Sequence, residues 1–146
     1  MRLVVFNRTR RRVPRKQLQR LSTLIAAEER RTQGRGAVNV IFTTDAHLRR
    51  LNKRYRHRDQ TTDVLSFNLE GFATERDVFG EVYISVAAAT RNASACGVSR
   101  QQELLRLTAH GLLHLLGYDH GDQRSSGRML ARQERYLERL GGGGHD

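Results

Sequence analysis

Three of the six histidines in this chain fall within the short segment HGLLHLLGYDH, from His110 to His120. His110 and His114 are four residues apart, so on a helix their rings lie on one face, one turn apart, where both can bind a single ion. Gly117 is suited to end that helix in the left-handed conformation, which would let His120 return as a third ligand. Three protein ligands leave one coordination position for water or substrate, which is typical of catalytic zinc. The segment therefore predicts one divalent metal ion, zinc, at the C-terminal end of the His-bearing helix.

The residue after the first histidine helps to distinguish between possible hydrolytic reactions. The spacing of the three histidines is also that of the metzincin proteases, in which a glutamate directly after the first histidine is the general base. Gly111 occupies that position here. A peptidase built on this pattern would lack the group that activates its water. A phosphodiester substrate fits better, because a metal ion and arginine can together neutralise the charge that develops on phosphate oxygens.

The charge of the chain points to the same kind of substrate. The formal net charge is +11, and 26 residues are Lys or Arg, all but two of them Arg. Residues 1–60 carry 17 of these against 4 acidic residues, whereas residues 61–146 carry 9 against 11. A preference for Arg codons would exchange Lys for Arg without creating net charge. We therefore predict a nucleic acid or another polyanion as partner, rather than a merely solvated basic surface.

Hydrophobic periodicity predicts the elements that must position these residues. Short apolar, β-prone runs predict strands at residues 3–6, 38–43, 64–68 and 80–85. Apolar residues at three- and four-residue spacing predict helices at 14–31, from about 45 through Tyr55, at 99–116 and at 124–140, and an Ala-rich stretch predicts another at 86–96. Pro14 is suited to open the first helix and Thr44 or Asp45 to cap the second, and Ser99 with Gln102 forms a capping box.

These elements indicate one α+β domain over residues 1–140, with a mixed sheet of roughly four strands and about five packed helices. Residues 141–146, GGGGHD, are expected to be a flexible tail. No apolar run approaches the roughly 20 residues of a membrane span, and the N-terminal segment lacks the apolar stretch of a signal peptide. We therefore expect a cytoplasmic protein without a membrane partner. Cys96 is the single cysteine, which excludes an internal disulfide, and we expect it to be buried.

Three blocks of sequence resemble one family. HGLLHLLGYDH is similar to the H-G-x-L-H-L-x-G-Y-D-H signature of the YbeY family of bacterial rRNA maturation factors. A second block is similar to the family's N-x-x-Y-R-x-x-D-x-P-T-D-V-L-S-F-P, and it comprises Asn52, Tyr55, Arg56, Asp59 and residues 62–67. A third, residues 80–85, resembles G-D-I-x-I-S. The blocks cover about residues 38–140 in family order, and Thr61 and Asn68 stand where the family usually has proline, which changes loop rigidity.

The resemblance implies a function and roles for particular residues. It implies that His110, His114 and His120 bind a metal ion, usually taken as zinc, and that Arg56 handles RNA. It implies single-strand endoribonuclease activity in rRNA maturation, especially at the small-subunit 3′ end, and a part in ribosome quality control. It further implies the small ribosomal subunit and the GTPase Era as partners.

The leading hypothesis is a metal-dependent endoribonuclease in which Arg56 and the basic N-terminal half hold single-stranded RNA. The general base could be a metal-bound hydroxide, Asp119 or the 2′-hydroxyl of the RNA itself. One rival is a non-catalytic ribosome-assembly factor with a structural zinc ion. The other is a hydrolase of peptides or small molecules, against which Gly111 and the net charge argue.

Several of these residues also have structural interpretations. Arg56 could simply end a solvated basic helix, and Asp119 could cap the turn after Gly117 instead of orienting His120 or moving a proton. Tyr118 is expected to pack in the core or turn. Asp63 could start a strand or face the cleft. Three histidines without a partner at ligand spacing are expected at the surface: His47, His57 and His145.

Overall fold

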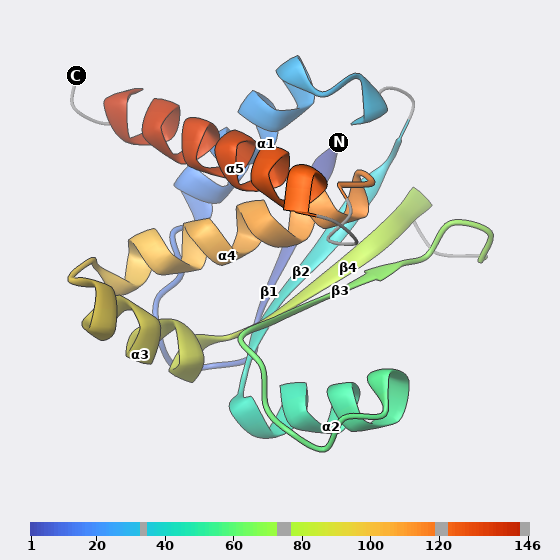
Figure 1. Ribbon diagram of the computed structural model, residues 1–146, viewed down its shortest axis with the longest axis vertical. Helices are drawn as coiled ribbons and strands as arrows, with labels where there is room; N and C mark the ends of the chain where they lie inside the picture. Colours follow the sequence, from blue (N-terminus) through green and yellow to red (C-terminus); the bar gives the residue numbers. More distant parts are fainter. Residues whose placement is uncertain (33–34, 73–76, 119–122, 144–146) are drawn as a thin grey trace.

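The computed structural model describes residues 1–32, 35–72, 77–118 and 123–143 (Figure 1). The predicted sheet is present, with four strands: β1 (Arg2–Asn7), β2 (Ala37–Thr43), β3 (Val64–Asn68) and β4 (Val78–Ser85). Their order is β1-β2-β4-β3. β1, β2 and β4 are parallel, and β3 is antiparallel to β4, so the sheet is mixed and β3 forms one of its edges.

The described residues form five α-helices. They are α1 (Arg15–Glu28), α2 (Asp45–Arg56), α3 (Val86–Cys96), α4 (Arg100–Leu115) and α5 (Gln123–Gly143). Four of them contact the sheet while α5 packs on α1 and α4, so the predicted α+β class is confirmed. Figure 1 shows α1, α4 and α5 on one side of the sheet and α2 on the other. α3 continues directly from β4 and packs against α4. No helix within the described ranges is both long and apolar enough to span a bilayer.

The core lies between the sheet and the layer of α1, α4 and α5. Side chains at helical spacing on α1 and at alternate positions of β2 and β4 are almost completely buried there. These residues are Leu18, Leu21, Ile25, Val38, Val40, Phe42, Val82 and Ile84. α4 runs through this core, and most of its residues from Glu103 to Leu115 are buried. The segment that carries His110 and His114 is therefore held rigidly by packing on several sides.

The predicted helix caps are present. The Ser99 side chain accepts a hydrogen bond from the amide of Gln102, and the Gln102 side chain accepts one from the amide of Ser99, so the capping box at the start of α4 is complete. Thr44 caps α2. Gly117, just beyond α4, has φ +97°, the left-handed region that was predicted from the sequence.

Three local expectations differ from the structure. α1 ends at Glu28, short of 31, because Glu29 leaves the helix in an extended conformation and the residues after it form a short 3₁₀ turn. α5 continues through Gly143, so the first three residues of the expected tail are helical, and residues 144–146 lie outside the described ranges. Cys96 is exposed rather than buried, since it lies on the outward side of the last turn of α3.

Candidate metal centre

His110 and His114 lie on the last turns of α4 with their rings close together. The ring centroids are 5.3 Å apart and the ring planes meet at 66°. Both residues are half-buried, and together they line a cavity of about 170 Å³ with Arg56, Val64, Leu65 and Ser66. The i, i+4 spacing thus places the two imidazoles on one face of α4, as predicted, and the structure adds that they line a small cavity beside the edge strand β3.

The orientation of His110 is fixed by a neighbouring helix. Nδ1 of His110 lies 3.0 Å from Oε1 of Gln133 on α5, and Gln133 is only 3% exposed. An amide oxygen can only accept a hydrogen bond, so Nδ1 carries the hydrogen and Nε2 has the lone pair that a metal ion requires. A metal-bound histidine usually has its second nitrogen anchored in this way. The donor chemistry of this pair therefore fits a zinc ion.

The third predicted ligand, His120, lies outside the described residues, as does Asp119. Among the residues that are described, His, Cys, Asp and Glu side chains form no group of three or more that could hold a metal ion. Three-histidine coordination therefore stays a prediction. Of the three predicted ligands, the structure describes His110 and His114.

The chain leaves α4 shortly after His114, beyond Leu115. The amide of Gly117 donates to the carbonyl of His114 at 3.0 Å, and the amide of Tyr118 donates to the carbonyl of Leu113 at 3.2 Å. Arg31, in the 3₁₀ turn after α1, donates from Nη1 to the carbonyl of Leu116 at 3.0 Å. The described part of this segment, through Tyr118, therefore leaves the helix at the predicted place and is held by a residue outside α4.

A buried carboxylate fixes the same turn. Glu29 is 6% exposed and accepts hydrogen bonds from the hydroxyls of Tyr118, at 2.8 Å, and of Tyr136. Burial, together with the bond to Glu29, raises the pKa of both tyrosines, because an anionic phenolate would lie in a dry site beside a carboxylate. Tyr118 thus packs in the turn as expected. Sequence reasoning did not find Glu29, which belongs to no motif.

Gly111 faces the sheet rather than the cavity. A Cβ atom at this position would lie 2.5 Å from Cγ1 of Val82 and 3.1 Å from Oγ of Ser66, both on the strands beneath α4. The Gly111 carbonyl accepts a hydrogen bond from Oγ of Ser66 at 3.2 Å. Glycine is therefore required for the close approach of helix and sheet, and a glutamate would not fit there.

Arg56 reaches the same cavity from the other side of the sheet. It is the last residue of α2, and its Nη2 donates to the carbonyl of Ser66 on β3 at 2.9 Å. Its guanidinium carbon lies 5.7 Å from the centre of the Phe67 ring. The structure therefore brings together Arg56 and the histidine pair, residues separated by more than fifty positions in the chain.

The remaining candidate residues lie elsewhere. Asp63 precedes β3, and its carboxylate accepts from Nδ2 of Asn92 at 3.1 Å, so it faces α3 rather than the cavity. His57 is exposed, as expected, and His145 lies outside the described residues. His47 was expected at the surface but is half-buried. It contacts Tyr83, and its pKa is lowered first by burial and then by Arg8 and Arg50.

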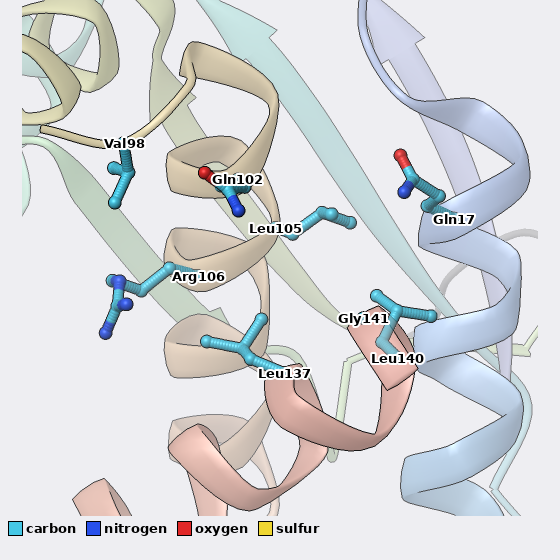
Figure 2. A pocket seen from close by; sticks show the side chains of 8 residues that line it. All are labelled: Gln17, Val98, Gln102, Leu105, Arg106, Leu137, Leu140 and Gly141. Atoms are coloured by element: carbon cyan, nitrogen blue, oxygen red, sulfur yellow. The ribbon is translucent and has the colours of Figure 1, made fainter. Parts of the chain in front are cut away.

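A larger cavity, of about 330 Å³, lies between α1, α4 and α5 (Figure 2). Most of the described residues that line it are apolar and none of them is a histidine, and the one charged side chain among them, Arg106, pairs with Glu103 and Glu134. The residues that α4 contributes are Gln102, Leu105 and Arg106, at the end of the helix away from His110 and His114. The chemistry of this chain is therefore not expected in that cavity.

Known proteins are similar to this chain over most of its length. A family model described as Endoribonuclease YbeY matches residues 4–141. A protein of that name from Heliobacterium modesticaldum is 43% identical over 115 residues, which cover 71% of this chain and 69% of the relative. Another from Chlorobium phaeovibrioides is 37% identical over 146 residues, covering 98% and 93%. A solution structure of a Thermotoga maritima protein superposes with a TM-score of 0.65 at 30% identity, covering 98% of this chain and 91% of that one.

Proposed function

The chain belongs to the YbeY endoribonuclease family, and we propose that it is a metal-dependent endoribonuclease that cuts single-stranded rRNA. The observation that carries the proposal is the single cavity that joins Arg56 to His110 and His114. It combines two nitrogen ligands for a divalent ion with a guanidinium suited to a phosphate group.

The chain's own residues would prepare this cavity for a phosphodiester. His110 and His114, with His120 as the proposed third ligand, would hold a zinc ion, which when bound supplies a Lewis acid for the phosphate oxygens. Gln133 orients the His110 ring before any substrate arrives. Arg56 would exchange its bond to the Ser66 carbonyl for a charge-assisted bond to the phosphate. Asp119 is a candidate for the base that accepts the proton of the attacking hydroxyl, and the attacking oxygen would come either from water or from the 2′-hydroxyl of the RNA.

The packing of Gly111 supports a phosphodiester rather than a peptide substrate. The metzincin general base would have to occupy space filled by Val82 and Ser66. The formal net charge of +11 also favours a polyanion over a peptide. Within the cell we propose small-subunit rRNA, especially its 3′ end, as substrate in ribosome maturation and quality control. We propose cytoplasmic action with the small ribosomal subunit and a GTPase of the Era type as partners.

A second candidate function is suggested by the bond between His110 and Gln133, which joins α4 to α5. A metal ion at this place could stabilise the packing of the two helices in a non-catalytic assembly factor. The two functions make different predictions for His114→Ala. A catalytic ion predicts loss of cleavage at nearly unchanged affinity for RNA, whereas a structural ion predicts a lower free energy of unfolding without any cleavage to lose.

The decisive experiment is cleavage of a defined rRNA precursor by wild-type protein and His114→Ala purified identically. We expect cleavage by the wild type, its loss with a chelator, and no cleavage by the variant. Equal cleavage by both preparations would indicate a contaminating nuclease and would refute the proposal. Mapping the product ends identifies the attacking oxygen, because attack by the 2′-hydroxyl leaves a cyclic phosphate whereas attack by water does not.

A further inference from the structure

A second cavity adjoins the histidine cavity. It measures about 380 Å³ and lies between the end of α2, the loop that follows it and β3. The residues that line it are Asn52, Arg56, Arg58, Gln60, Thr61, Thr62 and Leu65. Arg56 and Leu65 also line the cavity of His110 and His114, so the two spaces are neighbours that share a wall. Its volume lies within the usual range of about 300–1,000 Å³ for small-molecule sites.

The walls of the second cavity are fixed before any ligand binds. Asn52 is almost fully buried, and its Nδ2 donates to the carbonyl of Gln60 at 2.9 Å. The hydroxyl of Thr61 donates to the carbonyl of Asp45 at 3.3 Å. Nε of Arg49 donates to Asp59 at 2.8 Å. The loop from α2 to β3 is therefore tied to α2 at three points, and little conformational entropy would be lost on binding.

The lining has the chemistry of a nucleotide site. It offers two guanidinium groups for a phosphate, two threonine hydroxyls and a glutamine amide for a sugar or a base edge, and Leu65 for an apolar contact. None of the described side chains that line it is acidic. The nearby carboxylate of Asp59 is already paired with Arg49 and Lys53. The local charge is therefore positive.

We propose that this second cavity is a nucleotide subsite for single-stranded RNA. It holds the nucleotide next to the one whose phosphate lies at His110 and His114, with Arg56 between the two. The inference rests on the proposed endoribonuclease function and specifies where the RNA chain continues beyond the reacting phosphate. Tyr55, which is 54% exposed and lies against Phe67, extends the same surface with an aromatic ring suited to base stacking.

The test uses the full chain in a His114→Ala background, so that binding is measured without cleavage. Anisotropy of a fluorescein-labelled single-stranded RNA hexamer gives the Kd at several salt concentrations. Arg58→Gln should raise Kd about tenfold and lower the magnitude of the salt slope by about one. Thr62→Val, which removes a hydroxyl without changing charge, should raise Kd less and leave the salt slope unchanged.

Arg20→Gln is the matched control, because Arg20 is exposed on α1 and lines neither cavity. It removes the same charge and should change Kd less than about twofold. Equal losses of affinity in Arg20→Gln and Arg58→Gln would overturn the subsite, since diffuse charge would then explain binding. So would unchanged affinity in both Arg58→Gln and Thr62→Val.

Cleavage with intact His114 separates this inference from the proposed function. Arg58→Gln should raise KM and leave kcat close to wild type, because Arg58 does not line the histidine cavity. If the wild type does not cleave RNA but Arg58→Gln still weakens binding selectively, the endoribonuclease proposal fails and the binding site stands. If the wild type cleaves RNA and Arg58→Gln alters neither KM nor Kd, the subsite fails and the proposed function stands.

Discussion

Gln133 on α5 accepts a hydrogen bond from Nδ1 of His110 on α4, at a distance of 3.0 Å. The bond crosses the interface between two helices and fixes which imidazole nitrogen can bind a metal ion. The two residues are 23 positions apart in the chain, so the bond is a tertiary contact and not one between neighbours on the same helix.

Replacing Gln133 should weaken metal binding. Gln133→Leu removes the acceptor at similar volume, and we expect zinc affinity to fall about 10- to 100-fold, as for other residues that orient a metal-bound histidine. Competition with a chromophoric zinc chelator measures this affinity. Gln133→Glu keeps an acceptor at the same place and should retain most of it. Wild-type affinity in Gln133→Leu would show that the bond does not orient the ligand.

A side chain at position 111 should destabilise the protein. Gly111→Ala gains up to about 1 kcal/mol of helix propensity but places a methyl group against Val82 and Ser66, which typically costs about 1–3 kcal/mol. We expect a net loss of about 1 kcal/mol in the free energy of unfolding, measured in urea. Gly127→Ala on α5 is the control, because nothing lies within 4 Å of its Cβ position, and it should stabilise.

Gly111→Glu tests the same contact more severely. The larger side chain should prevent native folding rather than create a peptidase, because the position faces the strands. A folded, chelator-sensitive peptidase from Gly111→Glu would contradict the close packing of α4 on the sheet.

Reversing the charge of Arg56 should weaken RNA binding and leave the metal in place. Arg56→Glu should raise the Kd for single-stranded RNA at least tenfold near physiological salt, because a phosphate contact becomes a repulsion. Arg56→Lys keeps the charge without the planar guanidinium, and its Kd should lie between those of the wild type and Arg56→Glu. Native mass spectrometry measures bound zinc in each variant. Loss of zinc from Arg56→Glu would mean that Arg56 supports the metal site rather than the substrate.

Stability should fall at alkaline pH. The pKa values of Tyr83, Tyr118 and Tyr136 are raised, chiefly by burial, and that of Tyr83 is about 12. The folded chain therefore retains protons that the unfolded chain loses near pH 10. The contribution of these tyrosines to stability is complete below pH 10, and it is lost as the pH rises toward their pKa values in the folded chain. Urea denaturation between pH 9 and 11.5 measures the decline.

Tyr136→Phe provides the control for the alkaline decline. It should lower stability at neutral pH, because Glu29 loses a hydrogen-bond donor, and it should flatten the dependence on pH. An equally steep decline in Tyr136→Phe and in the wild type would assign the effect to other groups.

Local signals predicted much of the fold. The capping box of Ser99 and Gln102 and the left-handed Gly117 depend on residues within a few positions of each other, and both are present. The buried site of Glu29 could not be predicted in this way. Its partners Tyr118 and Tyr136 are 89 and 107 positions away, and Glu29 is also the extended residue at which α1 ends earlier than predicted.

The candidate site also combines residues that local sequence patterns predicted with residues that only tertiary contacts bring there. Helical periodicity predicted that His110 and His114 share a face, but no periodicity relates either residue to Gln133 or Arg56. Arg56 was selected through the family resemblance, and the hydrogen bond to Ser66 supplies its physical connection to the cavity. The surface prediction for His47 was wrong because its ring packs against Tyr83 on β4, a tertiary contact that no local pattern predicts.

The bond from Arg56 to the Ser66 carbonyl has a consequence for solubility. Residues 63 and 69 form backbone hydrogen bonds to β4, and along an antiparallel strand every second residue does so. The carbonyl of Ser66 therefore points away from β4, at the open edge of the sheet. An exposed edge strand can pair with a strand of another molecule, and a charged side chain across the edge hinders this pairing. Substitution of Arg56 should therefore favour self-association through the β3 edge. The activity of such variants is best compared on freshly isolated monomer.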